Sequence, residues 1–133
     1  MRYLVRGRRG HQRSQELWVS ADQIVTASIT YVETRAALAA GRRGRYWTGA
    51  ELVRLQQAWE DAWRDFVVVE VDPLVTFAAG LTDHDPLSGC DAVQLAAALA
   101  SACEVLVAAD RRLCAAARHQ QLEVVDLEEE QIS

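Results

Sequence analysis

Apolar residues recur along this chain with two different periods, which predict alternating strands and helices. Residues 23–27 and 104–108 are short runs of β-branched and other apolar side chains, which are typical of strands. Residues 66–71 begin with four consecutive apolar side chains, so a strand buried on both faces is predicted there. A last strand is predicted over residues 122–125.

Helical periodicity fills the intervals between these strands. The best-defined helix follows Thr48 and Glu51, whose spacing is that of a capping box, and it carries one apolar stripe. The stripe consists of Leu52, Leu55, Trp59 and Trp63. Gly41 is placed to end the preceding helix, which is predicted over residues 28–40. The other predicted helices cover residues 13–20, 73–81 with Asp72 as the cap, 88–102 and 110–119.

Strands that alternate with helices predict an α/β fold with a mostly parallel central sheet, because parallel strands need crossover connections of this length. At 133 residues, half of them hydrophobic, the chain suits a single domain over residues 1–133. No apolar run is long enough to span a membrane, and the Arg-rich start lacks the apolar stretch of a secretory signal. These features predict a cytoplasmic protein without membrane contact.

The net charge of −5 is unevenly distributed. A basic start over residues 1–11 and an acidic tail over residues 126–133 are both expected to be solvated and poorly ordered, with phosphate binding by the basic start as the alternative. The three cysteines, Cys90, Cys103 and Cys114, are odd in number and have no short spacing that suits zinc or redox chemistry. They are therefore expected to be reduced.

Three acidic residues occupy positions where α/β proteins place functional groups, at the carboxyl ends of the strands. Glu33 follows the strand at 23–27, Asp91 lies in the first turn of its helix, and Asp110 follows the strand at 104–108. Clustered carboxylates repel each other unless a cation neutralises them, and oxygen ligands without His or Cys favour Mg²⁺ or Mn²⁺. Such an ion suits phosphodiester hydrolysis.

Each of these acids also has a structural alternative at a helix N-terminus. Thr30 and Glu33 have the spacing of a capping box, Ser88 and Asp91 have the same spacing, and Asp110 can cap the helix that it opens. Spacing alone leaves both interpretations open.

Three segments of the chain resemble one known protein family. Residues 26–38, Thr-Ala-Ser-Ile-Thr-Tyr-Val-Glu-Thr-Arg-Ala-Ala-Leu, resemble the second strand and helix of PIN-domain proteins of the VapC toxin group, in which the Glu is a metal-site acid. Residues 86–96, Pro-Leu-Ser-Gly-Cys-Asp-Ala-Val-Gln-Leu-Ala, resemble the stretch where an Asp opens a helix. Residues 105–113, Val-Leu-Val-Ala-Ala-Asp-Arg-Arg-Leu, are similar to the strand and Asp that follow. They occur in the family order, and the resemblance covers residues 12–125.

The resemblance implies a PIN-like three-layer α/β/α fold and the activity of a metal-dependent endoribonuclease. Glu33, Asp91 and Asp110 would be the catalytic, metal-binding acids, with Mg²⁺ or Mn²⁺ as the cofactor and RNA as the substrate. The family also implies a homodimer and a cognate antitoxin protein. An unrelated nucleotide-binding α/β domain is a weaker alternative, since the chain has no phosphate-loop motif.

Arginines near the acids are candidates for binding RNA phosphates. They are Arg35, Arg111 and Arg112, which lie one turn or less from the three acids. Solvated or salt-bridge roles are equally compatible with their positions.

The start of the chain departs from the family pattern. Family members open with a strand that ends in an Asp, and that Asp completes a pocket of four acids, whereas residues 1–10 contain no acid. Residues 3–5 look like the end of the family's first helix, so the first strand is expected to be missing, through a late start codon or a decayed gene. Asp22 is no substitute because it precedes a strand. A second hypothesis is therefore a catalytically inactive protein that retains dimer or antitoxin binding.

Two further groups of residues have open roles. Asp83, His84 and Asp85 suggest a metal loop, but consecutive polar residues before a proline are more typical of a turn. Three tryptophans are expected to be core or dimer-contact residues rather than platforms for RNA bases. They are Trp47, Trp59 and Trp63.

Overall fold

The fold is organised around a five-stranded sheet in the order β3-β2-β1-β4-β5, in which every neighbouring pair is parallel. The computed structural model describes residues 2–5 and 22–128. The strands are β1 (Arg2–Val5), β2 (Gln23–Ala27), β3 (Val67–Val69), β4 (Val105–Ala108) and β5 (Glu123–Asp126). The predicted parallel α/β fold is confirmed.

Strand β1 corrects the expectation that the first strand is missing. It lies at the centre of the sheet, where Leu4 is in register with Val25 of β2 on one side and with Leu106 of β4 on the other. A run of three apolar residues is too short for its periodicity to distinguish a strand from a helix end. In the fold, residues 2–5 lie between β2 and β4, and the backbone groups on both edges of this segment form hydrogen bonds with those strands. The lack of an acid in residues 1–10 stands, because it is a property of the sequence.

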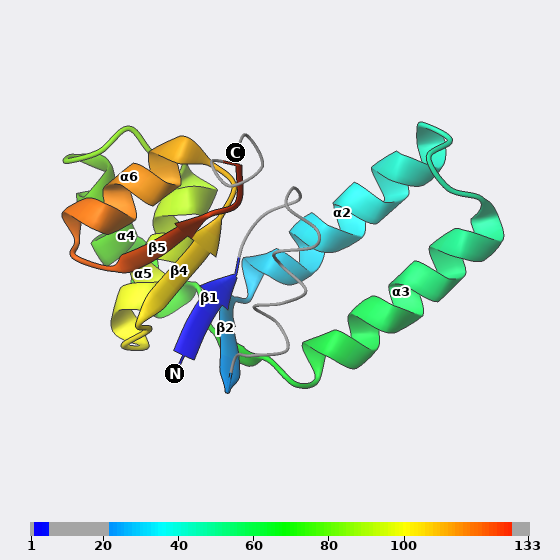
Figure 1. The fold of residues 1–133 in the computed structure, drawn as a ribbon, viewed down its shortest axis with the longest axis horizontal. Coiled ribbons are helices and arrows are strands. Elements are labelled where there is room, and N and C mark those ends of the chain that lie inside the picture. Colours follow the sequence, from blue (N-terminus) through cyan, green and yellow to red (C-terminus); the bar gives the residue numbers. More distant parts are fainter. Residues whose placement is uncertain (1, 6–21, 129–133) are drawn as a thin grey trace.

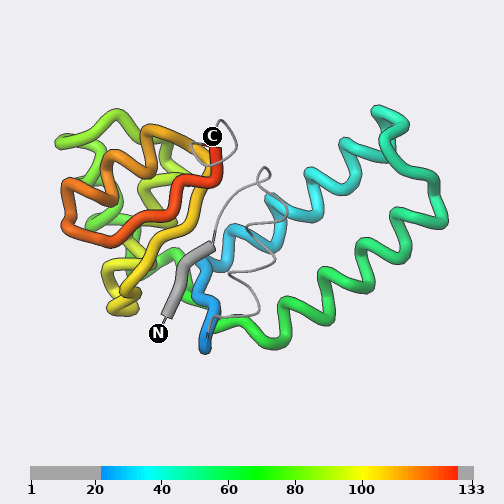
Figure 2. The backbone as a smooth tube through the Cα atoms, in the orientation of Figure 1, coloured from blue at the N-terminus to red at the C-terminus, as the bar shows by residue number. Residues whose placement is uncertain are grey.

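The helices divide the molecule into two parts (Figure 1). The long helices α2 (Ile29–Arg43) and α3 (Gly49–Trp63) form a projecting antiparallel hairpin, here called the arm (residues 29–66). The 3-10 turn η1 (Asp72–Leu74) and helices α4 (Val75–Thr82), α5 (Gly89–Ala100) and α6 (Arg111–His119) pack with the sheet to form the body. Figure 2 shows that the arm joins the body at one end only, through β2 and β3. The helix predicted at 13–20 lies outside the described residues.

The order of strands explains the three-layer arrangement. The connections from β3 to β4 and from β4 to β5 run in one direction across the sheet, whereas the connection from β2 to β3, which contains the arm, runs in the other. Parallel crossovers are right-handed, so the two directions place their helices on opposite faces. The PIN-like α/β/α architecture predicted from the resemblance is confirmed.

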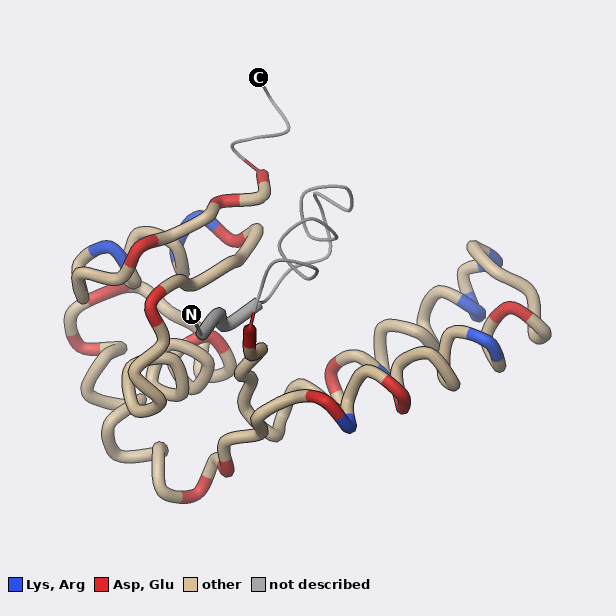
Figure 3. The backbone as a smooth tube through the Cα atoms, turned by 60° about the horizontal axis from the view of Figure 1, so that its bottom comes forward, with Lys and Arg blue, Asp and Glu red and all other residues tan. Residues whose placement is uncertain are grey.

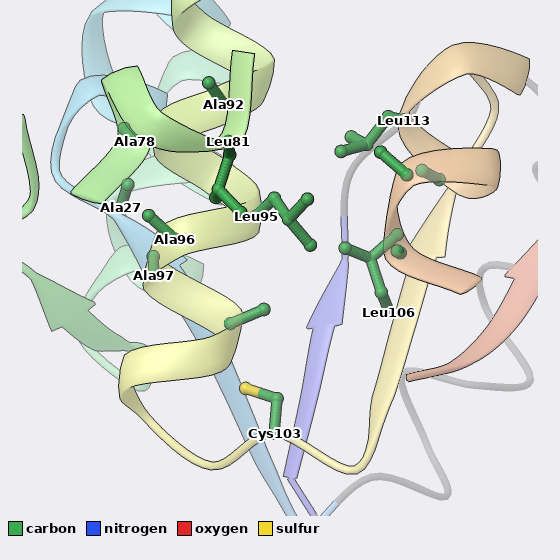
Figure 4. Packing of buried hydrophobic residues seen from close by; sticks show 14 of the residues in the cluster. Ala27, Ala78, Leu81, Ala92, Leu95, Ala96, Ala97, Cys103, Leu106 and Leu113 are labelled. Atoms are coloured by element: carbon green, nitrogen blue, oxygen red, sulfur yellow. The ribbon is translucent and has the colours of Figure 1, made fainter. Parts of the chain in front are cut away.

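The main core lies between α5, α6 and the face of the sheet that they cover. Leu95 of α5 points toward Leu106 of β4 and Leu113 of α6, and all three are at most 1% exposed (Figure 4). Three consecutive alanines, Ala96, Ala97 and Ala98, are fully buried in α5. Side chains this small let the helix approach its neighbours closely, and the alanine-rich sequence is therefore suited to a central helix.

Helix α2 does not end at Gly41, as the sequence predicts, but continues to Arg43. Gly41 is buried, and a Cβ atom at this position would lie 1.9 Å from Cζ2 of Trp47. The indole Nε1 of Trp47 donates to the carbonyl oxygen of Leu38 at 2.9 Å. Gly41 therefore makes room for a ring that packs across the helix, a role that only the tertiary structure reveals.

Several other expectations need correction. Strand β3 is a half-buried edge strand rather than one buried on both faces. Asp72 lies inside η1, whose N-cap is Val71 with no side-chain cap. The acidic tail was predicted to begin at residue 126, which is too early. Asp126 ends β5 and is 6% exposed, and Leu127 is fully buried.

Two predictions about the general properties of the chain can be compared with the structure. None of the three cysteines, all of which lie in the described part of the chain, forms a disulfide; Cys103 and Cys114 are buried and Cys90 is exposed. Among the described helices, none combines the length and hydrophobicity that crossing a membrane requires.

Candidate active site

The three predicted acids all belong to elements at the carboxyl edge of the sheet. Strands β2 and β4 flank β1 in parallel, so both end at this edge. Glu33 lies on α2, which follows β2, and Asp110 is separated from the end of β4 by one residue. Asp91 lies in the first turn of α5. Glu33 and Asp91 are half-buried, whereas Asp110 is exposed.

Asp110 caps helix α6, as the structural alternative predicts. Its Oδ1 atom accepts hydrogen bonds from the backbone N–H groups of Arg112, at 2.8 Å, and Leu113, at 3.0 Å. Both bonds end on the same oxygen. The other oxygen, Oδ2, remains available, so capping fixes the carboxylate without preventing it from binding a ligand.

Asp91 is held in place by the cap of α5 rather than acting as the cap itself. The Ser88 hydroxyl oxygen accepts a hydrogen bond from the backbone N–H of Asp91 at 3.2 Å. The Asp91 carboxylate thus stands in the first helical turn, where the helix dipole favours negative charge.

The capping alternative for Glu33 is wrong. The N-cap of α2 is Ser28, which makes no side-chain cap hydrogen bond, and Thr30 lies inside the helix. The hydroxyl of Thr30 is instead hydrogen-bonded to Thr26 and to Gln94, at 2.7 and 2.6 Å. Glu33 is therefore a half-buried acid in the second turn of α2 whose position does not follow from helix capping.

Sequence analysis missed the buried polar network beside these acids. Gln94, fully buried in α5, donates from Nε2 to Thr30, and its Oε1 accepts from the backbone N–H of Ala27 at 3.3 Å. Thr26 is 2% exposed. Gln94 is a single amide within an otherwise apolar helical face, and this was the signal in the sequence that could have revealed the network. A buried amide must find hydrogen-bond partners.

The chemistry of the donor set fits a hard divalent cation, because all three acids supply oxygen ligands. Their side-chain geometry is more open than such a site requires. Within residues 2–5 and 22–128, no three Asp, Glu, His or Cys side chains lie close enough together to hold a metal ion.

Comparison with known proteins identifies the family. The model of the PIN domain matches residues 1–119, a range that contains all three acids. The chain belongs to the PIN-domain family. It is 40% identical over 107 residues to each of two Mycobacterium tuberculosis proteins, Ribonuclease VapC45 and Ribonuclease VapC49, and the alignment covers 78% of this chain and 74% of each relative. The resemblance to VapC proteins is thereby confirmed.

A solved structure supports the same fold at lower sequence identity. The crystal structure of PAE2754 from Pyrobaculum aerophilum superposes with a TM-score of 0.72, covers 99% of this chain and 93% of its own, and is 20% identical. At this level of identity the likeness concerns the fold alone.

The predicted RNA-binding arginines of this PIN domain have different surroundings. Nη1 of Arg35 forms a salt bridge with Oε1 of Glu60 on α3 at 3.1 Å, so Arg35 connects the two helices of the arm. Arg111 and Arg112 are exposed in the first turn of α6, beside Asp110. Of the three, the pair on α6 is the better placed to meet a phosphate group.

Charge is unevenly distributed between the two parts of the PIN domain (Figure 3). The arm carries six arginines against five acids, whereas within residues 22–128 the body carries only Arg111, Arg112 and Arg118 against eleven acids. The body is therefore more negative than the arm.

Four aromatic side chains gather at the end of the arm that joins the body. The rings of Tyr31, Trp59, Trp63 and Phe66 form one cluster, with centroid distances between 5.3 and 6.3 Å. The Tyr31 hydroxyl donates to Glu60, and this hydrogen bond together with burial raises the pKa of Tyr31 above its ordinary value. Trp59 and Trp63 are half-buried in this cluster and Trp47 is half-buried at the far end of the arm, so none of the three belongs to the buried core.

The candidate metal loop is a turn. The backbone N–H groups of Asp83, His84 and Asp85 donate to carbonyl oxygens of α4. Asp85 is 8% exposed, and its Oδ1 lies 2.6 Å from Nδ1 of His119 at the end of α6. This pair links the turn to a distant helix, and its two members are 34 residues apart in the sequence.

Proposed function

We propose that this PIN domain is the toxin of a toxin–antitoxin pair, a metal-dependent endoribonuclease that hydrolyses RNA phosphodiester bonds. The observation that supports it best is the position of three acids at one sheet edge in a chain 40% identical to two ribonucleases. The same relatives support a cognate antitoxin, and the expectations of a homodimer and a cytoplasmic location remain part of the proposal.

Each residue has a definite part in this proposal. Glu33, Asp91 and Asp110 would hold Mg²⁺ or Mn²⁺, Asp110 through the oxygen that does not cap α6. The ion would neutralise the phosphate and lower the pKa of a bound water. One of the carboxylates would serve as general base for the attacking water. Arg111 and Arg112 would bind the phosphate backbone.

A second candidate is a catalytically inactive PIN-like protein that retains dimer or antitoxin binding. Two observations favour it. The strand at the centre of the sheet, β1, contains no acid, and the described residues do not present a three-ligand metal group as they stand. A carboxylate pocket with one member fewer binds a divalent ion less tightly, because fewer charges and ligands surround it.

The substitution Asp110→Asn separates catalysis from helix capping. Asparagine caps helices about as well as aspartate, so the stability should change by less than about 0.5 kcal/mol, while the charge is lost. We expect RNA cleavage in Mn²⁺ to fall by about 100-fold or more. The measurement is the cleavage of labelled RNA at several Mn²⁺ concentrations, with thermal unfolding of the same samples.

The matched control is Asp83→Asn, which removes one exposed acid from the turn after α4. It should cleave RNA at the rate of the unsubstituted protein. Equal cleavage by Asp110→Asn would contradict the assignment of this acid. No metal-dependent cleavage by any of the proteins would favour the inactive binding protein instead.

A further inference from the structure

The polar network around Gln94 connects two elements that carry proposed metal ligands. The Gln94 amide binds Thr30 in the first turn of α2 and the backbone of Ala27 at the end of β2. Thr30 in turn binds Thr26. The two contacts of Gln94 join residues more than sixty positions apart in the sequence, at the edge of the sheet where the acids are found.

An amide at this position is unusual on grounds of packing alone. The buried face of α5 is otherwise built from Ala92, Leu95, Ala96, Ala97 and Ala98. An apolar residue of similar size would fill the same space without the desolvation of an amide. The amide forms directional hydrogen bonds, which fix α5 relative to α2 in a way that apolar packing does not.

The geometry of the two helices places Glu33 and Asp91 on the same side of this contact. Helix α5 runs back along the sheet, antiparallel to β1 (Figure 4), whereas α2 leads outward from the end of β2 (Figure 1). Asp91 precedes Gln94 by three residues, and Glu33 follows Thr30 by three. Each step is about 4.5 Å along the helix axis and stays on one helix face. Asp91 and Glu33 therefore both lie farther out than the Gln94–Thr30 contact, beyond the carboxyl edge of the sheet.

We propose that Gln94 and Thr30 are positioning residues that set the separation between Glu33 and Asp91. Two helices joined here only by apolar packing could shift against each other, and such a shift would change the separation of the two acids. The hydrogen bond between Gln94 and Thr30 opposes this movement and keeps the pair ready for a cation. The role in metal binding rests on the proposed function, but the distance between the two helices can be measured without metal or RNA.

The first experiment measures the separation of α2 and α5 directly. Spin labels on Val32→Cys, whose native side chain is 56% exposed, and on the native, exposed Cys90 report the distance between the helices. Dilution with unlabelled protein restricts the signal to pairs within one chain. We expect a narrow distance distribution that broadens in Thr30→Val and in Gln94→Leu, both of which remove the hydrogen bond between the helices.

The control variants separate positioning from general loss of stability. Thr30→Ser keeps the hydroxyl and should restore the narrow distribution. Leu81→Val changes a buried residue of α4 outside the network and should leave the distribution narrow even where the unfolding temperature falls. An unchanged distribution in Thr30→Val and Gln94→Leu would overturn the proposal, whatever the protein does with metal.

The second experiment measures Mn²⁺ affinity from the signal of free Mn²⁺ in electron paramagnetic resonance. Loss of a group that orients a metal ligand reduces affinity by about 10- to 100-fold, which we expect for Thr30→Val but not for Thr30→Ser. If the unsubstituted protein binds Mn²⁺, equal affinities for Thr30→Val and Thr30→Ser would overturn the positioning role. If the unsubstituted protein binds no Mn²⁺ but its distance distribution still depends on Thr30, the proposed metal-dependent function fails and the positioning role stands.

Discussion

The body and the arm of this PIN domain are built from equally regular helices, but they are stabilised in different ways. In the body, α5 buries a continuous face of small and aliphatic side chains, and β4 is buried along its whole length. In the arm, α3 has no buried residue, and Gly41 is the only one in α2. The body thus depends on the removal of apolar surface from water, whereas the arm, exposed on most sides, depends on a small number of specific contacts.

The contacts that hold the arm together are local and identifiable. Thr48 and Glu51 form the predicted capping box at the start of α3, and the backbone hydrogen bond from Thr48 lowers the pKa of Glu51. Arg35 and Glu60 link the two helices, and the aromatic cluster packs between them. Within the described part of the chain, the buried Nε1 of Trp59 has no hydrogen-bond partner, which reduces what the cluster contributes. We therefore expect the arm to loosen before the body unfolds.

The largest effect is expected from Leu95→Ala in the body. Leu95 is 1% exposed and lies between the sheet and α6, so its truncation leaves a cavity that the close-packed core cannot fill. The free energy of unfolding should fall by about 3–5 kcal/mol, measured by urea denaturation. The matched truncation in the arm, Leu55→Ala, removes a side chain that is 37% exposed and should have a much smaller effect. Equal losses at the two positions would contradict the distinction between body and arm.

An intermediate effect is expected from Gly41→Ala at the far end of the arm. The new methyl group would overlap the ring of Trp47, which must swing away and give up its hydrogen bond to Leu38. The stability should fall by about 1–2 kcal/mol, with a red shift of the tryptophan fluorescence.

Gly80→Ala is the control for this substitution, because α4 leaves open space around Gly80. There the better helix propensity of alanine should stabilise the protein by about 0.5–1 kcal/mol. If both variants changed stability by the same amount, steric overlap with Trp47 would not explain the glycine at position 41.

The smallest effect is expected from Tyr31→Phe and appears only at high pH. Because the folded state raises the pKa of Tyr31, the neutral phenol contributes stability below the unfolded value of about 10, and this stability is lost as the pH rises toward the folded pKa. The unsubstituted protein should therefore lose stability more steeply above about pH 10 than Tyr31→Phe does. Urea midpoints measured from pH 8 to pH 11 check this, and parallel curves would exclude the hydrogen bond to Glu60 as a source of stability.

How far the site could be predicted differs from residue to residue. Asp110 lies two residues after the end of a buried strand, and both its position and its capping role were predictable from a few neighbouring residues. The alternatives for Glu33 could not be separated, because the choice depends on what Thr30 binds, and its partner Gln94 is 64 residues away. Strand β1 was missed for a similar reason, since its neighbours in the sheet come later in the chain.

The sequence by itself determined the alternation of helices and strands, the parallel sheet and the ends of the sheet where the acids lie, because these follow from local periodicity, capping and crossover length. Tertiary structure alone decided that residues 2–5 fill the centre of the sheet, that Gly41 accommodates Trp47 and that Gln94 connects α5 to α2. Each of these depends on a partner that is distant in the sequence or set by packing, and such partners leave no periodic signal along the chain.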